Sequence, residues 1–395
     1  MMEDAERRGY MTPEEGKSFL CAQHLTNKYL KQFINDKGHS GTCSYCSKTG
    51  IVLDLAVFID HIGDRMLNFV GPIENESLPL ATSFYDDDEE VIPGFERRGL
   101  FIAPNNAEYY EDVHEVMEDF DLVSSNERLN QDIASCFFVN QWIRRDPTEL
   151  LLNEELFYLW NDFSEMVKKR CRFTFFRNKE YFSDKYGYKY GSDIIADVSS
   201  LVTLTEDTIY PGTYLFRGRP DGSDAPYTTF KSLSAPPITS AKANRMSPYG
   251  ISMFYGSFEA STPVAEINNY MEDKTKVYVG KFRVMRPLIV INFCNMPYPN
   301  FWMNGKDEWQ KYAFLHQFHD EISKPIGKND SDIEYIPSQV FTEYLRYIQK
   351  TKDGSKYDGI IYRSAITKRD NIVLFYDNNT SNEILELVSS EISSE

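Results

Sequence analysis

Two short pairs of residues near the N-terminus have the chemistry and spacing of metal ligands. Cys21 and His24 form the first pair and Cys43 and Cys46 the second, with two residues between the members of each pair. This gap lets both side chains of a pair turn toward one ion, so two pairs complete a tetrahedral Zn²⁺ shell with no open position. The sequence therefore predicts a structural zinc ion. His39 is the alternative to His24, and unpaired reduced cysteines are the alternative to a metal site.

The remaining candidate ligands are isolated in the sequence. Cys136, Cys171 and Cys294 have no cysteine or histidine at metal-ligand spacing, and we expect them to be packing residues. His316 and His319 are three residues apart and share one face of a predicted helix. Without a third ligand nearby they are not expected to bind a metal.

A second group of residues, in the C-terminal half, could bind an anion and a flat ring. Arg217 ends a short apolar strand and Arg245 precedes a turn, and each guanidinium could make paired hydrogen bonds to the phosphates of a dinucleotide. Tyr255 could stack on a heteroaromatic ring. Glu266 could bind ribose hydroxyls or stabilise positive charge on a sugar. The alternative is that the arginines form surface ion pairs, Tyr255 is a core residue and Glu266 is a solvated helix residue.

At these residues the sequence resembles the RES-domain family, which is named for an arginine, a glutamate and a serine. The resemblance covers about residues 210–376. Seven motifs follow in the family's order: Phe-Arg-Gly-Arg at 216–219, Ala-Pro-Pro at 235–237, Arg-Met-Ser-Pro-x-Gly at 245–250, Phe-Tyr at 254–255, Thr-x-x-x-Glu at 262–266, Pro-Ser-Gln at 337–339 and Tyr-Asp-Gly-Ile-Ile-Tyr-x-Ser at 357–364. Seven ordered motifs are far more specific than any one of them.

The resemblance implies a fold similar to that of ADP-ribosyltransferase toxins and an activity that degrades NAD⁺. It implies that Arg217 and Arg245 hold NAD⁺ and that Tyr255 packs against its nicotinamide end. Glu266 would act at the nicotinamide ribose, and Ser364 would complete the pocket by hydrogen bonding. The expected catalytic set is therefore Glu266, Tyr255, Arg245 and Ser364, of which the last three also bind substrate together with Arg217.

The function that we expect is an NAD⁺ glycohydrolase, which cleaves the nicotinamide–ribose bond and acts as a bacterial toxin or defence effector. The same residues would serve an ADP-ribosyltransferase with a macromolecular target or an NAD⁺ phosphorylase. A non-enzymatic alternative is a zinc-stabilised interaction module with a decayed NAD⁺ site. An antitoxin or regulatory protein and a second copy of the chain are the expected candidate partners.

The N-terminal part resembles the HEPN/RES N-terminal region that precedes some RES domains. Ribonucleases of the HEPN type carry an arginine followed after four to six residues by a histidine. The middle of this chain has no such pattern, which disfavours ribonuclease activity. We interpret this region as structural or regulatory.

The elements that must position these residues change in type along the chain. Residues 109–169 have mostly helical periodicity, whereas short β-type runs and interleaved helices follow residue 200, which predicts an α+β protein. The predicted division is a zinc-binding knuckle at 1–55, a helical HEPN/RES N-terminal-like domain at 56–195, an α+β ADP-ribosyltransferase-like RES domain at 196–380 and an acidic flexible tail at 381–395. An insertion-like stretch at 295–332 could cover the pocket or bind a partner.

Composition excludes two classes of partner. The 395 residues carry a formal net charge of −18, so the long-range field repels polyanions and nucleic acid is not an expected partner. No apolar run approaches the roughly 20 residues that span a bilayer, and the charged N-terminus is unlike a signal peptide. We therefore expect a cytoplasmic protein without membrane attachment.

Overall fold

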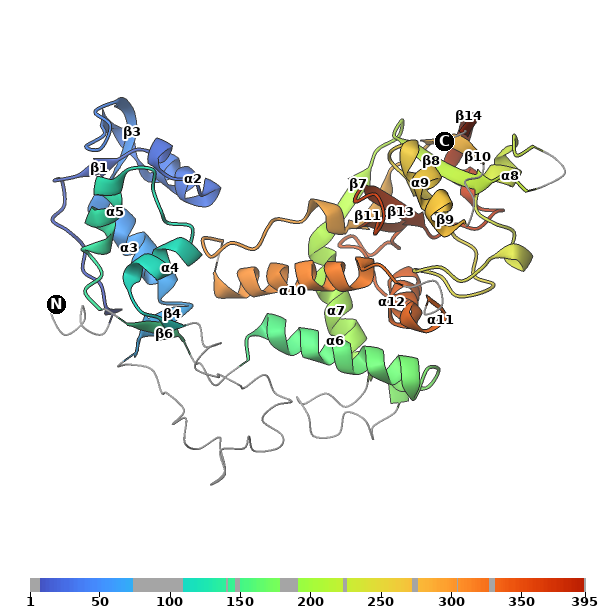
Figure 1. Ribbon diagram of the computed structural model, residues 1–395, viewed down its shortest axis with the longest axis horizontal. Coiled ribbons are helices and arrows are strands. Elements are labelled where there is room, and N and C mark those ends of the chain that lie inside the picture. Colours follow the sequence, from blue (N-terminus) through green and yellow to red (C-terminus); the bar gives the residue numbers. More distant parts are fainter. Residues whose placement is uncertain are drawn as a thin grey trace, which may run out of the picture. The chain divides into compact units, whose positions relative to one another are not determined.

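The chain forms two compact units. The computed structural model describes residues 8–73, 109–139, 141–145, 150–177, 191–222, 226–271, 276–303, 305–326 and 331–393. The first unit comprises Met1–Leu152 and Pro299–Lys311, and the second comprises Asn153–Tyr298 and Tyr312–Glu395. Figure 1 labels the elements of both units.

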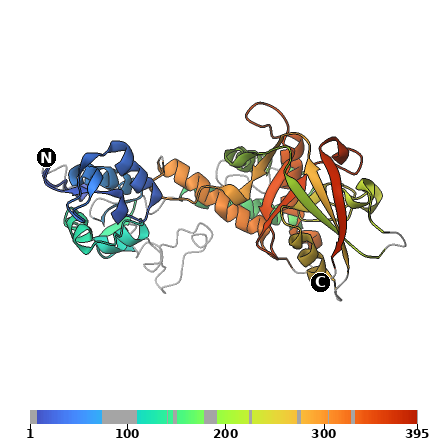
Figure 2. The ribbon, with the colours of Figure 1, turned by 90° about the horizontal axis from the view of Figure 1, so that it is seen from above.

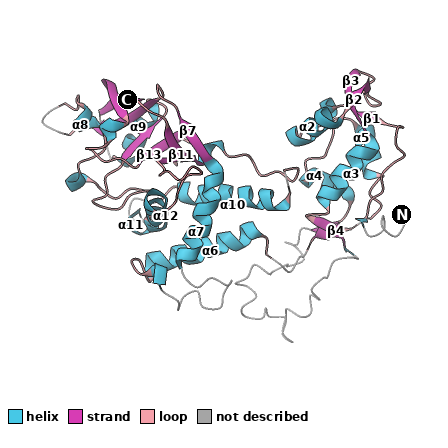
Figure 3. Cartoon of the chain, turned by 180° about the vertical axis from the view of Figure 1, so that it is seen from behind, coloured by secondary structure: helices cyan, strands magenta, loops and turns pink. Residues whose placement is uncertain are grey.

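The first unit combines helices with two three-stranded antiparallel sheets, β1-β3-β2 and β4-β6-β5. Figure 3 shows helices α3, α4 and α5 between these sheets. The elements are β1 (Phe19–Leu20), the 3₁₀ helix η1 (Ala22–His24), α2 (Lys28–Lys37), β2 (His39–Thr42), β3 (Thr49–Asp54), α3 (Leu55–Met66), β4 (Val70–Pro72), β5 (Tyr109–Tyr110), α4 (Val113–Asp119), α5 (Glu127–Ala134) and β6 (Trp142–Arg144).

The cysteine-containing segment shares its core with the helices that follow it. Leu20 and Leu53 belong to the same buried cluster as Ile62 and Val116. The predicted separate domain at 1–55 is therefore wrong, because the small sheet has too little apolar surface to form a core by itself. Asn27 follows η1 and is the N-cap of α2. Its side chain accepts hydrogen bonds from the Tyr29 and Leu30 amides.

Part of the predicted insertion belongs to the first unit. Phe301 stacks on Phe120 with ring centroids 4.1 Å apart. Trp302 is 4% exposed, and its indole N–H donates to the Phe120 carbonyl at 2.7 Å. The Arg65 guanidinium donates to the carbonyl of Met303. The stretch at 299–311 thus completes the core of this unit.

The second unit contains an eight-stranded sheet in the order β14-β10-β8-β9-β13-β12-β11-β7, whose strands lie side by side in Figure 2. Among the described strands of this sheet, β11 and β12 alone pair in parallel. The strands are β7 (Glu206–Ile209), β8 (Tyr214–Pro220), β9 (Phe254–Ser257), β10 (Val277–Val284), β11 (Leu288–Asn292), β12 (Gly359–Arg363), β13 (Asp370–Leu374) and β14 (Leu385–Ser393).

Helices and short 3₁₀ turns accompany this sheet. They are α6 (Leu152–Lys169), η5 (Phe175–Arg177), α7 (Gly191–Val202), η6 (Thr203–Thr205), α8 (Phe230–Leu233), η7 (Ile238–Ser240), α9 (Ser261–Tyr270), η8 (Phe293–Asn295), α10 (Lys306–Ser323), α11 (Ser331–Glu334), α12 (Ile336–Tyr347) and η9 (Ser381–Glu383). The chain is thus a mixed α+β protein with a helical N-terminal region and a sheet-rich C-terminal unit.

The predicted acidic flexible tail is wrong. Residues 385–393 form β14, which pairs antiparallel with β10 from Leu385, opposite Val284, to Ser393, opposite Val277. The apolar side chains Leu385 and Leu387 pack against the core of the sheet. The serines and glutamates of this strand gave the segment a polar sequence, which is typical of an edge strand.

The helix that carries Glu266 packs directly on the sheet. Gly218 of β8 allows this approach, because a Cβ atom there would lie 2.8 Å from Ile267 Cδ1 and 3.0 Å from Pro263 Cβ. A larger residue at 218 would require the end of the Ile267 side chain to move and Pro263 to shift by a few tenths of an ångström. The glycine of the Phe-Arg-Gly-Arg motif therefore permits the close packing of α9 on β8.

Aromatic packing joins α6, α10 and α12 within the second unit. The Trp160 ring lies 4.8 Å from Phe318 and 6.2 Å from Phe341, measured between ring centroids. Helices α6 and α7 belong to this unit almost entirely. The structure thus places the change of unit at residue 152, whereas the predicted boundary was at 195.

We predict that Trp302→Ala destabilises the first unit by about 3–5 kcal/mol, since the substitution leaves a large cavity and an unpaired Phe120 carbonyl. Hydrogen exchange measured by mass spectrometry should show faster exchange in α3 and α4. Tyr298→Ala, at a side chain that is 74% exposed, is the control and should change exchange little. Unchanged protection in Trp302→Ala would contradict the assignment of 299–311 to this core.

Candidate active site and metal centre

The four predicted metal ligands lie together in the first unit. Their ligand atoms are all within 4.8 Å of one another. Cys21 Sγ lies 3.7 Å from Cys46 Sγ, and Cys43 Sγ lies 3.3 Å from His24 Nε2. Four Zn²⁺ ligands at bond lengths of about 2.0–2.3 Å would be separated by about 3.3–3.8 Å in a tetrahedron. The group could therefore bind zinc, whereas His39 packs its ring against Phe19 outside the cluster.

A tight turn positions the second ligand pair. The Ser47 amide donates to the Cys43 carbonyl at 2.9 Å, and the Tyr45 amide donates to Cys43 Sγ at 3.4 Å. An N–H group directed at sulfur stabilises a metal-bound thiolate. The Tyr45 hydroxyl also donates to Asp132 of α5 at 2.8 Å. A metal here would connect the β2–β3 turn to η1 and support the helix beside it.

The two C-terminal histidines make other contacts. His316 Nε2 lies 3.0 Å from the Pro297 carbonyl, and His319 Nε2 accepts the Arg363 amide at 3.2 Å. Burial lowers the pKa of His319 to about 4, so its ring is a neutral acceptor at pH 7. His319 therefore supports the end of β12, immediately before Ser364.

A cavity of about 470 Å³ in the second unit collects most of the predicted site residues. This volume lies within the range of small-molecule sites. Arg245, Tyr255, Glu266 and Ser364 all line it. The full set of lining residues is Lys242, Ala243, Asn244, Arg245, Tyr255, Glu266, Ile326, Tyr335, Tyr362, Ser364, Ala365, Ile366 and Asn371.

Glu266 is held at one of its two oxygens. Its Oε1 accepts a hydrogen bond from Ser364 Oγ at 2.5 Å and another from Asn371 Nδ2 at 2.7 Å. No hydrogen bond from the described residues reaches Oε2. Bonds to a charged acceptor are short and strong, so the carboxylate has a fixed orientation with one oxygen available for a ligand.

Ser364 is itself fixed by the turn that follows β12. Its Oγ accepts the amides of Ile366 at 3.3 Å and Thr367 at 3.2 Å while donating to Glu266. Ser364 is 1% exposed. The hydroxyl hydrogen is therefore committed to Glu266, which makes Ser364 an orienting residue.

Tyr255 faces the cavity with its ring. Its hydroxyl lies 2.9 Å from Ser247 Oγ and accepts the Met246 amide at 3.3 Å. Burial raises the pKa of Tyr255 above its usual range. The phenol is thus un-ionised, and its hydroxyl is bound by the turn at 244–247.

Arg217 is the one predicted site residue that does not line the cavity. Its Nε donates to the Ser234 carbonyl at 3.0 Å, and its Nη1 donates to the Tyr255 carbonyl at 2.7 Å. Burial and the neighbouring Arg219 lower the pKa of Arg217 to about 9, which leaves it charged at pH 7. In this structure Arg217 fixes the backbone at Tyr255.

Arg245 connects the cavity to the C-terminal end of α10. Its guanidinium donates to the carbonyls of Ile322 at 2.5 Å and Lys324 at 2.8 Å, and it lies over the Tyr335 ring at 5.0 Å. A cation at a helix C-terminus satisfies carbonyls that have no partner within the helix. Ile326, which follows this contact, lines the cavity, so the end of the predicted insertion contributes one residue to its wall.

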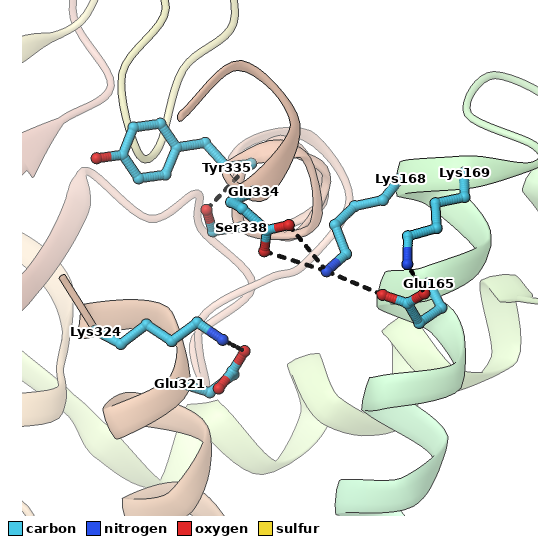
Figure 4. A network of polar contacts seen from close by, with 8 residues as sticks. All are labelled: Glu165, Lys168, Lys169, Glu321, Lys324, Glu334, Tyr335 and Ser338. Atoms are coloured by element: carbon cyan, nitrogen blue, oxygen red, sulfur yellow. Dashed lines mark hydrogen bonds and ion pairs between the residues drawn. The ribbon is translucent and has the colours of Figure 1, made fainter. Parts of the chain in front are cut away.

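Helix α12 holds the Arg245 segment from the other side. Ser338 Oγ donates to the Arg245 carbonyl at 2.6 Å, and Gln339 Nε2 donates to the Asn244 carbonyl at 2.8 Å. These are the serine and glutamine of the Pro-Ser-Gln motif. Figure 4 shows Tyr335 and Ser338 beside Glu334, which pairs with Lys168 of α6 at 3.2 Å. Lys168 also pairs with Glu165 at 3.1 Å.

Sequence reasoning missed several residues of the cavity. Lys242, Asn244 and Asn371 are polar lining residues, and Tyr335 and Tyr362 are aromatic ones. None of the five was assigned a role in the site. Asn371 in particular begins an apolar strand, and a single polar residue there gives no signal of its surroundings.

Two protein-family models match the chain, and their bounds differ from those of the two compact units. A model described as "RES domain" matches residues 218–388, and one described as "HEPN/RES N-terminal domain 1" matches residues 36–181. The chain contains a RES domain, preceded by a HEPN/RES N-terminal domain. The RES domain indicates an NAD-processing enzyme. A search of curated proteins finds no match.

The RES match includes both Glu266 and Ser364 and ends within β14, so the C-terminal strand is part of the RES domain. The N-terminal match includes Cys43 and Cys46 and begins after Cys21 and His24. It ends beyond α6. No helix in the described part of this RES protein has both the length and the apolar character needed to cross a membrane.

We predict that the purified protein contains about one zinc ion per chain and that Cys43→Ser loses it, because a buried Cys₃His group binds zinc as four ligands. Elemental analysis of the dialysed protein measures this. Cys171→Ser is the matched control, since Cys171 lies outside the cluster, and it should retain the metal. Equal zinc content in all three proteins would contradict the site.

Proposed function

We propose that the RES domain hydrolyses NAD⁺ at its nicotinamide–ribose bond. The observation that supports this most is the meeting of Arg245, Tyr255, Glu266 and Ser364 around one cavity within the matched domain. Motifs that are far apart in the sequence supply these four residues. A structural role alone gives no reason for a carboxylate, a guanidinium and an aromatic ring to face one cavity.

The reaction requires stabilisation of positive charge at the ribose. When the bond between C1″ and the pyridinium nitrogen breaks, its electron pair neutralises the nicotinamide, which leaves without protonation. The ribose then has oxocarbenium character, as in glycoside hydrolysis. The oriented carboxylate of Glu266, with Oε2 available, would stabilise this charge. Water adds to C1″ and loses a proton, giving ADP-ribose, nicotinamide and H⁺.

The charges on the cavity wall suit the two ends of NAD⁺. Lys242 and Arg245 lie on one segment of the lining, and Glu266 lies on α9. The cationic nicotinamide would be favoured near Glu266 and the pyrophosphate near the basic segment. Lys242 is exposed and can reach an anion more freely than Arg245, whose guanidinium is engaged with two carbonyls.

The biological role that we propose is depletion of NAD⁺ as a toxin or defence effector. Continuous hydrolysis of a shared cofactor harms the cell that makes the enzyme, so such an activity requires a partner that restrains it. We propose an antitoxin or regulatory protein as that partner. The Cys21, His24, Cys43 and Cys46 group would hold a structural zinc ion, distant in sequence from the reaction and without a part in it.

We predict that Glu266→Gln lowers nicotinamide release from NAD⁺ by roughly 10²–10³-fold, because the amide cannot stabilise the cationic ribose. Chromatography of the products measures free nicotinamide and ADP-ribose. Free ADP-ribose supports hydrolysis, whereas label attached to protein or nucleic acid would make the enzyme a transferase. ADP-ribose 1″-phosphate would make it a phosphorylase.

Glu259→Gln is the matched control for this substitution. Glu259 lies just before α9 and pairs with Arg369 at 3.4 Å on the surface, outside the cavity lining. We expect its activity to equal that of the parent. If Glu266→Gln is equally active, the role of Glu266 is wrong, and if the parent releases no nicotinamide, the proposed function is wrong.

A further inference from the structure

A second cavity, of about 580 Å³, lies next to the candidate active site and has no part in the steps described above. Its walls come from the segment after α6, from η5, from α12 and from the loop at 243–249. Most of the lining is apolar, with aromatic rings from Phe173, Phe176, Tyr249 and Tyr347. Its volume and its apolar walls are those of a small-molecule site.

The second cavity shares a wall with the candidate active site. Ala243 lines both of them. Its neighbour Lys242 lines the candidate active site, and Tyr249, later in the same loop, lines the second cavity. Lys242 is exposed and Ala243 is half-buried, so the shared edge reaches the surface of the molecule. A long ligand in one cavity can therefore extend across Ala243 into the other.

The aromatic rings of the second cavity are accessible to a ligand. Tyr249 is 67% exposed and Tyr347 is 52% exposed. Exposed apolar side chains that gather at one place mark a ligand or partner site. The flat face of a nucleobase stacks on such rings and covers them from water.

Two charged side chains give this cavity a chemical preference. Arg172 and Glu343 line it, are exposed, and make no hydrogen bond or ion pair with the described residues. The edge of adenine carries an acceptor, N7, beside a donor, the amino group at position 6. A guanidinium donates and a carboxylate only accepts, so Arg172 and Glu343 supply the two groups that this edge requires.

We propose that the second cavity binds the adenine of NAD⁺ while the nicotinamide end lies at Glu266. This inference rests on the proposed function. The pyrophosphate then crosses Ala243, where the exposed Lys242 side chain supplies positive charge. The second cavity thus determines which dinucleotides the enzyme accepts, because it adds binding energy that only an adenine can provide.

The first experiment compares NAD⁺ with NMN⁺, which has the same nicotinamide ribose and lacks the adenosine. We expect Tyr347→Ala to lower kcat/KM for NAD⁺ by about 5- to 100-fold, the usual effect of losing one ring that stacks on a base. For NMN⁺ the change should be less than about twofold, because no adenine is present. Nicotinamide release is the readout. An equal change with both substrates would overturn the proposal.

The second experiment tests the adenine edge with nicotinamide hypoxanthine dinucleotide, in which an oxygen replaces the amino group at position 6. The parent should prefer NAD⁺ by about 10-fold in kcat/KM, because the Glu343 carboxylate cannot accept a hydrogen bond from that oxygen. In Glu343→Gln the preference should fall to about twofold or less, since an amide both accepts and donates. A preference that survives the substitution unchanged would contradict the role of Glu343.

Tyr210→Ala is the control for Tyr347→Ala. Tyr210 is 69% exposed in the same unit and lines neither cavity. Its kinetics with each substrate should equal those of the parent. Tyr347 and Glu343 are both exposed, so their variants should fold, and circular dichroism checks this.

Binding of ADP-ribose, measured by calorimetry, separates this inference from the proposed function. ADP-ribose carries the adenine and requires no turnover, and Tyr347→Ala should bind it about 5- to 100-fold more weakly than the parent. Equal affinity, or no binding by either protein, would overturn the adenine site and leave a partner protein as the occupant of the apolar surface. Failure of the parent to release nicotinamide from NAD⁺ would overturn the proposed function instead.

Discussion

The candidate active site depends on one carboxylate oxygen that two parts of the fold hold together. Glu266 comes from α9, whereas Ser364 and Asn371 come from the β12–β13 hairpin. In the sheet, β9 lies between β13 and β8, the strand on which α9 packs. The two hydrogen bonds therefore form only if α9 lies close to β8, and Gly218 makes that distance possible. A local feature of strand packing thus determines where Glu266 directs its second oxygen.

The two arginines that were expected to hold NAD⁺ donate hydrogen bonds to backbone carbonyls in this structure. Arg217 fixes the Tyr255 carbonyl, and Arg245 closes the end of α10. A guanidinium offers five donors in a rigid plane, so it can organise several carbonyls at once. With a chain charge of −18, recognition of an anionic dinucleotide must come from a few such local groups, not from the overall field.

The strands of the sheet and the group of metal ligands could be predicted from sequence, because each follows from a pattern of residue types or spacing. The short β-type runs expected after residue 200 form strands of the large sheet, and the cysteine and histidine pairs have an informative spacing. The contacts of Arg217 could not be predicted, because an arginine suits phosphate oxygens and carbonyl oxygens equally. Asn371 could not be found since its role arises only from its distance to Glu266. β14 was missed because an edge strand exposes half of its residues to water.

The position of Trp302 has a consequence for how the chain is made. The core of the first unit includes Trp302, yet this residue follows β11 in the sequence. During synthesis from the N-terminus, the core around helices α2 to α5 lacks Trp302 until strands β7 to β11 of the other unit have been translated. The HEPN/RES N-terminal unit can therefore complete its folding only after much of the RES sheet has been translated. The two family matches follow one another along the sequence, whereas the first unit is completed by residues 299–311, which lie within the RES match.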